Sequence, residues 1–290
     1  MLTKVLVATY NIHYGVGRDN RLDLKRSIDA IANADVIALQ EVDVNWDRSQ
    51  NQDQVDLIRR MLPEHEVAWG PTIDVCKSGE SGVRRQFGNM ILSRYPIVSI
   101  RNYLLTKYGA AVYLDMQKGA LEAVIDTPMG LLRFYSTHLC STSVKQRHRQ
   151  LEWLIEHHKR VADEGPVLAG QHPDDTWTSE PALPSMPSEA ILLGDFNFED
   201  TTESYTALVG EHSERFGHLT NRGGFVDAWS VCHGFSEAAR EAGSTILPPH
   251  AHRVDYCFVS ESLIGRITSA TVDRAADGSD HQPLLVKFNG

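Results

Sequence analysis

The stretch "ILLGDFNFED" (residues 191–200) runs an apolar segment into a glycine and at once presents two hydrogen-bonding side chains. Its first residues have the length and composition of a short buried strand. Asp195 and Asn197 follow, two positions apart on either side of a phenylalanine. An aspartate or asparagine beside a glycine is usually turn chemistry. The stretch indicates more than a turn only because the same arrangement recurs along the chain.

Three other apolar segments of strand length end in a polar side chain. Asn11 follows "KVLVATY" (4–10), Glu41 follows "DVIALQ" (35–40), and His138 follows "LLRFYST" (131–137). Taken singly, each of these residues is explained as well by a turn, a cap or contact with water. Together with Asp195 they predict a ligand site, because α/β sheets bind ligands at the carboxyl ends of their strands.

A second group of polar residues precedes strands instead of following them. The group consists of Asp255 before "YCFVS" (256–260), Asp280 and His281 before "PLLVKF" (283–288), and Asn89 before "MILS" (90–93). If these strands run antiparallel to the first group, their starts lie at the edge where the other strands end. We therefore expect both groups to converge on one cleft.

The N-terminal third predicts parallel strands. "RLDLKRSIDAIANA" (21–34) places apolar residues at helical spacing between the strands at 4–10 and 35–40. Strand, amphipathic helix, strand is a βαβ unit, whose two strands run parallel. A longer helix is expected from about 143 to 163. Its apolar face is assigned to Val144, Leu151, Leu154, Ile155 and Val161.

Other segments predict antiparallel pairs. "ALEAVID" (120–126) and "LLRFYST" (131–137) flank "TPMG", a good hairpin turn. "NMILSRYPIVSI" (89–100) predicts two strands bent at Pro96. Hairpins beside a βαβ unit favour a mixed-sheet α/β layered fold, in a single domain over residues 1–290.

Composition and charge limit the class of protein. The chain has 290 residues, 42% of them hydrophobic, and a net charge of −10. That charge argues against a long, sequence-independent contact with nucleic acid, which needs a basic stripe. It suits a carboxylate-rich site whose charge a metal ion offsets. The four cysteines lie far apart without metal-site spacing, so we expect buried, reduced thiols.

The start of the chain carries no recognisable targeting signal. "MLTKVLVATYNIHYG" (1–15) has an apolar run too short to span a membrane, and no small-residue cleavage site follows it. We expect a cytoplasmic protein.

One long stretch has no pattern typical of a strand or a helix. Residues 164–190, "EGPVLAGQHPDDTWTSEPALPSMPSEA", contain five prolines and no periodicity. Such a loop is too long for an ordinary connection and is usually either functional or mobile. One interpretation is a lid insertion that brings Trp177 to a substrate; the other is a mobile excursion on the surface.

Seven segments in order, covering nearly the whole chain, resemble the endonuclease/exonuclease/phosphatase superfamily, which includes pancreatic deoxyribonuclease, apurinic endonucleases, inositol polyphosphate phosphatases and neutral sphingomyelinases. They are "TYNIHYG", "LQEV", "GNMILSRYPI", "STHL", "LLGDFN", "RVDYCFVS" and "SDHQPL". Each motif is weak alone, but seven in one order are specific. The resemblance implies a four-layer sandwich of two mixed β-sheets packed face to face with helices outside. It also implies metal-dependent hydrolysis of a phosphoester.

The resemblance also implies a role for each residue of the cleft. Glu41 is the principal metal ligand, with Asn11 and Asp280 beside it. The catalytic residues are Asp195 for the attacking water, Asn197 for a phosphate oxygen, His281 polarised by Asp255 at the phosphoryl group, His138 for charge on the phosphate or leaving group, and Asn89 for the ring of His138. Oxygen donors of this kind suit Mg²⁺ or Mn²⁺. Asp255 should raise the pKa of His281 and keep it cationic.

One position departs from the apurinic endonuclease pattern. Those enzymes carry an acidic residue two positions after the first asparagine, and here that place is His13. A second metal held by an extra carboxylate is therefore in doubt. The form "NIHYG" looks more like the branch that acts on lipids and small molecules. We expect a phosphodiesterase for a small-molecule or lipid-headgroup substrate, with His13 near it.

Two alternatives stay open on the sequence. A nuclease would use the same site, and "GVRRQFGN" (82–89) places Arg84 and Arg85 where they contact either a phosphate or only solvent. The chain lacks a continuous basic stripe with interleaved aromatic residues, so a nuclease ranks second. A scaffold that keeps the fold without the chemistry ranks third, because the residue set is intact.

Overall fold

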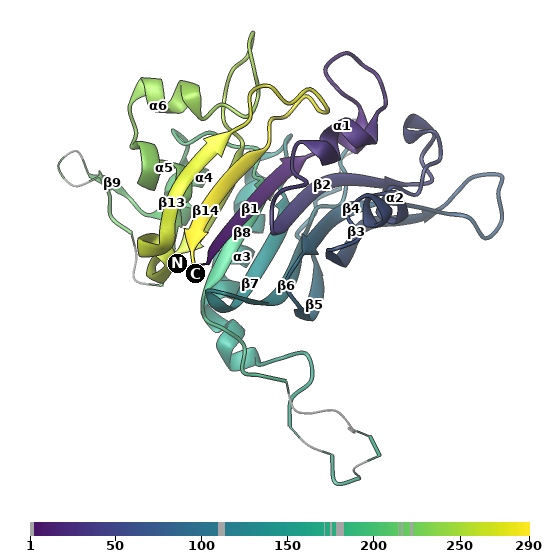
Figure 1. The fold of residues 1–290 in the computed structure, drawn as a ribbon, viewed down its shortest axis with the longest axis horizontal. Coiled ribbons are helices and arrows are strands. Elements are labelled where there is room, and N and C mark those ends of the chain that lie inside the picture. Colours follow the sequence, from purple (N-terminus) through teal and green to yellow (C-terminus); the bar gives the residue numbers. More distant parts are fainter. Residues whose placement is uncertain are drawn as a thin grey trace.

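Two six-stranded sheets form the centre of the molecule (Figure 1). The computed structural model describes residues 3–109, 114–170, 172–174, 176–177, 183–213, 215, 217–220 and 223–290. The first sheet has the order β13 (Ile267–Val272), β14 (Leu284–Asn289), β1 (Lys4–Asn11), β2 (Val36–Val44), β4 (Arg84–Ser93), β3 (Glu66–Cys76). The second has the order β11 (Phe225–Asp227), β12 (Asp255–Ser260), β8 (Ala190–Asp195), β7 (Gly130–His138), β6 (Gly119–Thr127), β5 (Ile97–Leu104). A small pair, β9 (His212–Ser213) and β10 (Gly217–His218), lies apart from both.

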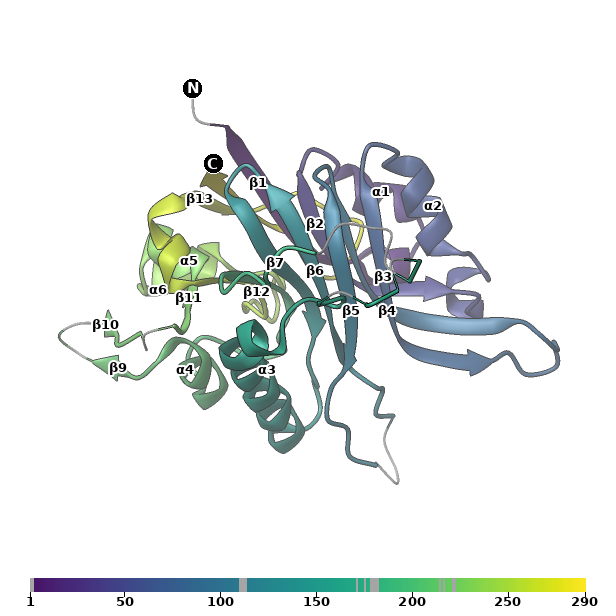
Figure 2. The same ribbon diagram turned by 90° about the horizontal axis from the view of Figure 1, so that it is seen from below.

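Helices cover the outer face of each sheet, which makes four layers (Figure 2). The helices are α1 (Leu24–Asp29) and α2 (Gln54–Met61) on the first sheet, α3 (Val144–Glu164) and α4 (Glu203–Val209) on the second, and α5 (Ala228–His233) and α6 (Glu237–Ala242) at one side. Short 3₁₀ turns are η1 (His13–Gly15), η2 (Asp47–Ser49) and η3 (Glu261–Arg266). The predicted four-layer sandwich of two mixed sheets is therefore confirmed.

Apolar burial explains this layering. The inner faces of the two sheets share one core, in which β1 and β2 residues such as Val7 and Ala38 meet Leu121 and Phe134 of the second sheet. A second core forms under α1 and α2, and a third under α3 and α4. Each strand of the central pairs is thus buried on both faces, as its near-continuous apolar sequence predicts.

The strand directions agree with those predicted. β1 pairs parallel with β2, and β7 parallel with β8. β14 runs antiparallel to β1, and β12 antiparallel to β8. The ends of β1, β2, β7 and β8 consequently share one edge with the starts of β12 and β14. We call this edge the site edge.

Several local predictions were wrong. β2 continues past Glu41 to Val44 through a bulge, and β4 starts at Arg84, so that Asn89 lies inside a strand. The helix expected at 21–34 spans only Leu24–Asp29. Val144 is 57% exposed, because it opens α3 directly after the cap residue Ser143 and faces solvent. Pro96 does separate two strands, β4 and β5, but they belong to different sheets.

The cysteine prediction is half right. All four thiols are free; Cys140 and Cys257 are buried, whereas Cys76 and Cys232 are exposed. No helix among the described residues is long and apolar enough to cross a membrane.

The segment 164–190 does not reach the site edge with its described residues. Residues 171, 175 and 178–182 of it lie outside the described part of the chain. Arg133, near the start of β7, donates hydrogen bonds to the Pro187 and Ser188 carbonyls, each at 2.8 Å. His138 lies five residues along that strand, about 16 Å away. Figure 1 shows the segment leaving the molecule where β1 begins and β14 ends. The lid interpretation is therefore wrong for the part of the segment that is described.

Candidate active site

The two sheets meet at the site edge through Asn11, the last residue of β1. Its Nδ2 donates a hydrogen bond to Oδ2 of Asp195 at 3.0 Å and to Oε1 of Glu41 at 3.3 Å. Asp195 ends β8 in the second sheet, whereas Asn11 and Glu41 belong to the first. One buried amide thus joins the residue predicted to activate water to the residue predicted to hold a metal. The predicted convergence across the two sheets is present.

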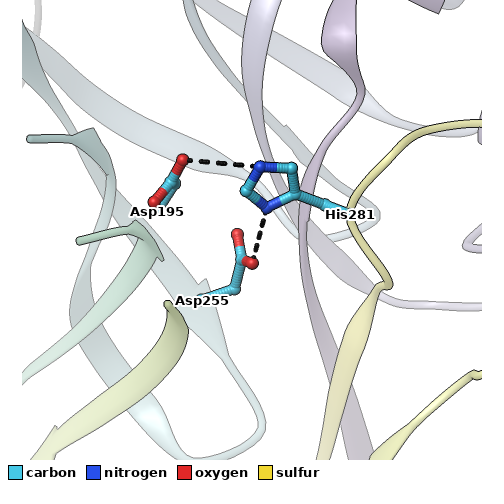
Figure 3. A group of neighbouring side chains, drawn as sticks. All are labelled: Asp195, Asp255 and His281. Atoms are coloured by element: carbon cyan, nitrogen blue, oxygen red, sulfur yellow. Dashed lines mark hydrogen bonds and ion pairs between the residues drawn. The ribbon is translucent and has the colours of Figure 1, made fainter. Parts of the chain in front are cut away.

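His281 lies between two carboxylates (Figure 3). Its Nδ1 donates to Oδ2 of Asp255 at 2.7 Å, and its Nε2 lies 3.8 Å from Oδ2 of Asp195. Burial lowers the pKa of His281, but the charge and hydrogen bond of Asp255, with further negative charge from Asp195 and Asp280, raise it to about 10. The side chain is therefore an imidazolium at neutral pH. This is the effect on His281 that was expected of Asp255.

Burial is the main influence on the pKa of Asp195. Desolvation raises the pKa of this carboxyl to about 7, while the positive charge of His281 lowers it and Asp255 raises it further. The backbone N–H of Asn197 donates to Oδ1 of Asp195 at 2.9 Å, and the Asn197 amide donates to the Leu139 carbonyl at 3.0 Å. The carboxylate therefore lies fixed at the strand end with a pKa close to neutrality, which suits a group that exchanges protons.

Glu41 and Asp280 supply the oxygen-rich side of the cleft. Glu41 sits on the β2 bulge with φ +60°, a strained conformation for this residue type that turns its side chain out of the strand alternation. Its Oε1 lies 3.9 Å from Nδ1 of His138. Asp280 Oδ1 lies 3.6 Å from Nδ1 of His13, and the His13 N–H donates to Oδ1 of Asn11 at 3.0 Å. His13 is therefore part of this group.

The sequence profile of the Endonuclease/Exonuclease/phosphatase family matches residues 8–281. The chain belongs to this family. Its members hydrolyse phosphoesters and generally use divalent metals. The chain matches none of the curated proteins compared with it.

Solved structures share the family fold at low sequence identity. An endonuclease/exonuclease/phosphatase from Beutenbergia cavernae DSM 12333 superposes with a TM-score of 0.67 at 18% identity, over 99% of this chain and 71% of that one. Truncated Caenorhabditis elegans TDP2 gives 0.60 at 15% identity, over 99% and 98% of the two chains. A mannosyl-6-phosphatase of Bacteroides thetaiotaomicron VPI-5482 gives 0.59 at 18% identity, over 97% and 98%. At these identities the likeness concerns the fold alone.

Asn89 does not hold the ring of His138, contrary to the role that the family resemblance implied. Its Nδ2 donates to the Gly119 carbonyl at 3.0 Å. Gly119 begins β6 and pairs with His138 of β7. Asn89 therefore ties the first sheet to the strand beside His138, and it acts on the site only through the backbone.

The group that does contact the His138 ring is Lys118, which the sequence analysis missed. Its Nζ lies 2.8 Å from Nε2 of His138, and the lysine is only 5% exposed. Burial, with the positive charges of Lys118 and His281, lowers the pKa of His138 well below its ordinary value. In "DMQKGALE" a single lysine before a strand is typical of a solvent contact, so no local signal marks it as buried.

Three residues predicted to contact the substrate, Arg84, Arg85 and Trp177, contact other side chains instead. Arg84 and Arg85 belong to the start of β4 and form ion pairs, Arg84 with Asp74 at 2.8 Å and Arg85 with Asp47. Trp177 is 75% exposed and stacks on His172, with ring centroids 5.0 Å apart. The loop expected around the two arginines is a strand, in which Arg84 pairs with Asp74 of β3 and Arg85 with Asp47 of η2.

Another arginine, Arg48, lies near the 3₁₀ turn that carries His13. Arg48 is held by both oxygens of the buried Asp43, at 2.8 and 2.9 Å, and its guanidinium lies 4.4 Å from the centre of the Tyr14 ring. Tyr14 follows His13 in the same 3₁₀ turn. The sequence "DVNWDR" gave no signal for this contact, because it depends on the fold of the loop after β2.

Proposed function

We propose that this chain is a Mg²⁺- or Mn²⁺-dependent phosphoester hydrolase, a phosphodiesterase for a small-molecule or lipid-headgroup substrate. The observation that carries the proposal is the buried Asn11–Asp195–His281 contact. It places a carboxylate with a pKa near 7 beside an imidazolium with a pKa near 10. Such a pair offers a proton acceptor for water and a cationic donor for a phosphoryl oxygen in one place.

The donor set on the other side of the cleft fits a hard divalent cation. Glu41 and Asp280 offer carboxylates, and Mg²⁺ and Mn²⁺ prefer oxygen ligands. The third ligand that we assign is the Asn11 amide oxygen, which also accepts from the His13 N–H. A divalent ion held there would act as a Lewis acid on a phosphoryl oxygen. The ligand atoms of Asp195, Asp255 and His281 also lie within 4.8 Å of one another. An imidazolium bound to two carboxylates has no free lone pair, so we assign the metal to the Glu41 side.

The proposal assigns a role to Asp195, to His281 with Asp255, and to Asn197. Asp195 receives a proton from the attacking water and keeps its position through the Asn11 amide and the Asn197 N–H. His281, held by Asp255, donates a charged hydrogen bond to the phosphoryl group. Asn197 follows Asp195 by two residues with φ +53°, and we assign to it the contact with a phosphate oxygen.

Arg84 and Arg85 no longer favour a nuclease, because both are engaged in ion pairs. The net charge of −10 also gives no support to a long contact with nucleic acid. The small-molecule or lipid-headgroup substrate therefore stays our proposal. The experiment that tests it is turnover of bis(p-nitrophenyl) phosphate, sugar phosphates, phospholipid headgroups and DNA, each with Mg²⁺ or Mn²⁺ and again with EDTA. Turnover of none of them, or undiminished turnover in EDTA, would contradict the proposal.

Glu41→Gln is expected to weaken Mg²⁺ binding by more than about tenfold, because the neutral amide offers one weaker ligand oxygen in place of a carboxylate. Isothermal titration calorimetry of the purified protein measures this without a substrate. Glu156→Gln, an exposed glutamate of α3, is the matched control and should bind as the wild type does. Equal Mg²⁺ affinity in Glu41→Gln and the wild type would show that Glu41 is not a metal ligand.

The rate should depend on the protonation of Asp195. Its pKa is raised from the ordinary 3.8 to about 7, so the carboxylate form is present above about pH 7 and lost below it. Since the proposed base must be ionised, kcat should rise with pH through this region and level off above it. A pH profile of kcat between about pH 5 and 9 measures the effect. A profile already flat from about pH 5 upward would show that no group of this kind limits the reaction.

A further inference from the structure

Lys118 lies inside the candidate site although nothing in its sequence surroundings predicts that position. It directly precedes Gly119, the first residue of β6, which pairs with His138 at the end of β7. This register brings the lysine side chain to the site edge. Its Nζ contacts Nε2 of His138 at 2.8 Å, and His138 Nε2 in turn lies 3.5 Å from Oδ2 of Asp195.

A buried ammonium is costly unless a partner compensates its charge. Among the residues that the structure describes, Lys118 has no carboxylate within ion-pair distance, and its one hydrogen-bond partner is the neutral ring of His138. Burial lowers the pKa of Lys118, and the more distant charges of Glu41 and Asp195 oppose that effect. The fold thus places a buried lysine at the site edge with no carboxylate of the described residues paired to it.

The contact with His138 fixes what each group can do. When Lys118 is an ammonium it has three N–H donors and no acceptor, so it donates to Nε2 and leaves the ring proton of His138 on Nδ1. Nδ1 faces Oε1 of Glu41 at 3.9 Å. In that arrangement Nε2 of His138 is engaged by Lys118 and has no proton to offer a phosphate. Lys118 retains two N–H groups that bond to no described residue.

We propose that Lys118 is a catalytic residue that donates hydrogen bonds to a non-bridging oxygen of the phosphoryl group, and that His138 is the positioning residue that holds it. The inference rests on the proposed phosphoester hydrolysis and assigns to Lys118 the charge stabilisation expected of His138. Negative charge on the phosphoryl oxygens and the leaving oxygen must be offset during in-line attack. A cationic donor in a desolvated site does this more effectively than one in water.

Two variants separate charge from position. Lys118→Met removes the ammonium and every N–H donor, whereas Lys118→Gln loses the charge but keeps an amide that can still donate to His138. Lys145→Met, an exposed lysine at the start of α3, is the control. Both Lys118 variants should lower kcat/KM by about 10²- to 10³-fold, the loss typical of one charge-stabilising donor. Both should also weaken the binding of inorganic phosphate by about tenfold or more, while the control changes neither.

The binding of inorganic phosphate, followed by calorimetry with Mg²⁺ present, does not depend on knowing the substrate. It should weaken in Lys118→Met also when His138 is already replaced by glutamine. No further weakening in that background, or wild-type phosphate affinity in Lys118→Gln, would show that Lys118 only supports His138 and would overturn the proposal. If the wild type hydrolyses no phosphoester, the proposed function fails, and the phosphate measurement still decides whether Lys118 contacts the anion. Near-UV circular dichroism checks folding, and Lys118→Gln decides the matter if Lys118→Met is unfolded.

Discussion

Asp195→Asn should lower kcat on bis(p-nitrophenyl) phosphate by about 10²- to 10⁴-fold in the presence of Mg²⁺, the range that a positioned general base contributes. The amide has the size of the carboxyl group but accepts no proton from water. Burial already raises the pKa of Asp195 to about 7, so the site accommodates a neutral side chain and the variant should fold. Initial rates at saturating substrate, with a thermal melt of the same sample, measure both effects.

Asp126→Asn is the control for this substitution. Asp126 is exposed near the far end of β6 and takes no part in the site. It should leave kcat unchanged within a factor of about two, as expected for a surface substitution. If Asp195→Asn keeps a rate comparable to that of the control, another group activates the water, and our role for the strand-end carboxylate is wrong.

His281→Gln should lower kcat by about 10²- to 10³-fold, because the variant keeps a donor but loses the positive charge at the phosphoryl group. Asp255→Asn should cost less at neutral pH and should change the pH profile instead. Asp255 is the main cause of the raised pKa of His281, so its removal lowers that pKa from about 10. The cationic form, present below the pKa, is then lost at a lower pH. The alkaline limb of the profile moves toward neutrality.

His250→Gln, an exposed histidine in the loop before β12, controls for the loss of an imidazole. Its rate and its pH profile should equal those of the wild type. An unmoved alkaline limb in Asp255→Asn would mean that His281 does not act as the cation, even if His281→Gln is slow.

Local pattern predicted the fold and much of the site for a physical reason. A strand with both faces buried reads as an apolar run, and the polar residue that ends it is visible in the same few letters. Asn11, His138, Asp195 and Asp255 were found in this way, and each stands at a strand end at the site edge. The parallel pair β1–β2 followed from the βαβ unit, and the antiparallel pair β6–β7 followed from the hairpin.

The misses concern contacts between side chains or backbone groups of different strands. Lys118 and His138 meet through the β6–β7 register, and Asn89 reaches Gly119 across the sandwich. No pattern in the sequence near those residues predicts either contact. The described residues of the segment expected as a lid lie away from the site edge for another reason. Residues 164–190 precede β8, so they enter that strand at its start, about 16 Å from Asp195 at its end.

Glu41 lies at the site edge, but for a reason that the sequence shows only in part. The sequence places it after the strand, whereas β2 continues to Val44 and the side chain leaves the strand alternation through a bulge at φ +60°. Bulges of this kind redirect one side chain beside a site. No residue in "LQEVDV" predicts the bulge, which is visible only in the pairing of β2 with β4.

Anomalous diffraction from crystals grown with Mn²⁺ and inorganic phosphate tests the central claim most directly. We claim that opposed strands of two sheets build one centre, with the metal on Glu41 and the phosphoryl group next to His281. The expected map has a manganese peak at the Glu41 carboxylate, and a phosphate between that peak and the imidazolium. Manganese bound between Asp195 and Asp255 in place of the His281 contact, with Glu41 unoccupied, would contradict it.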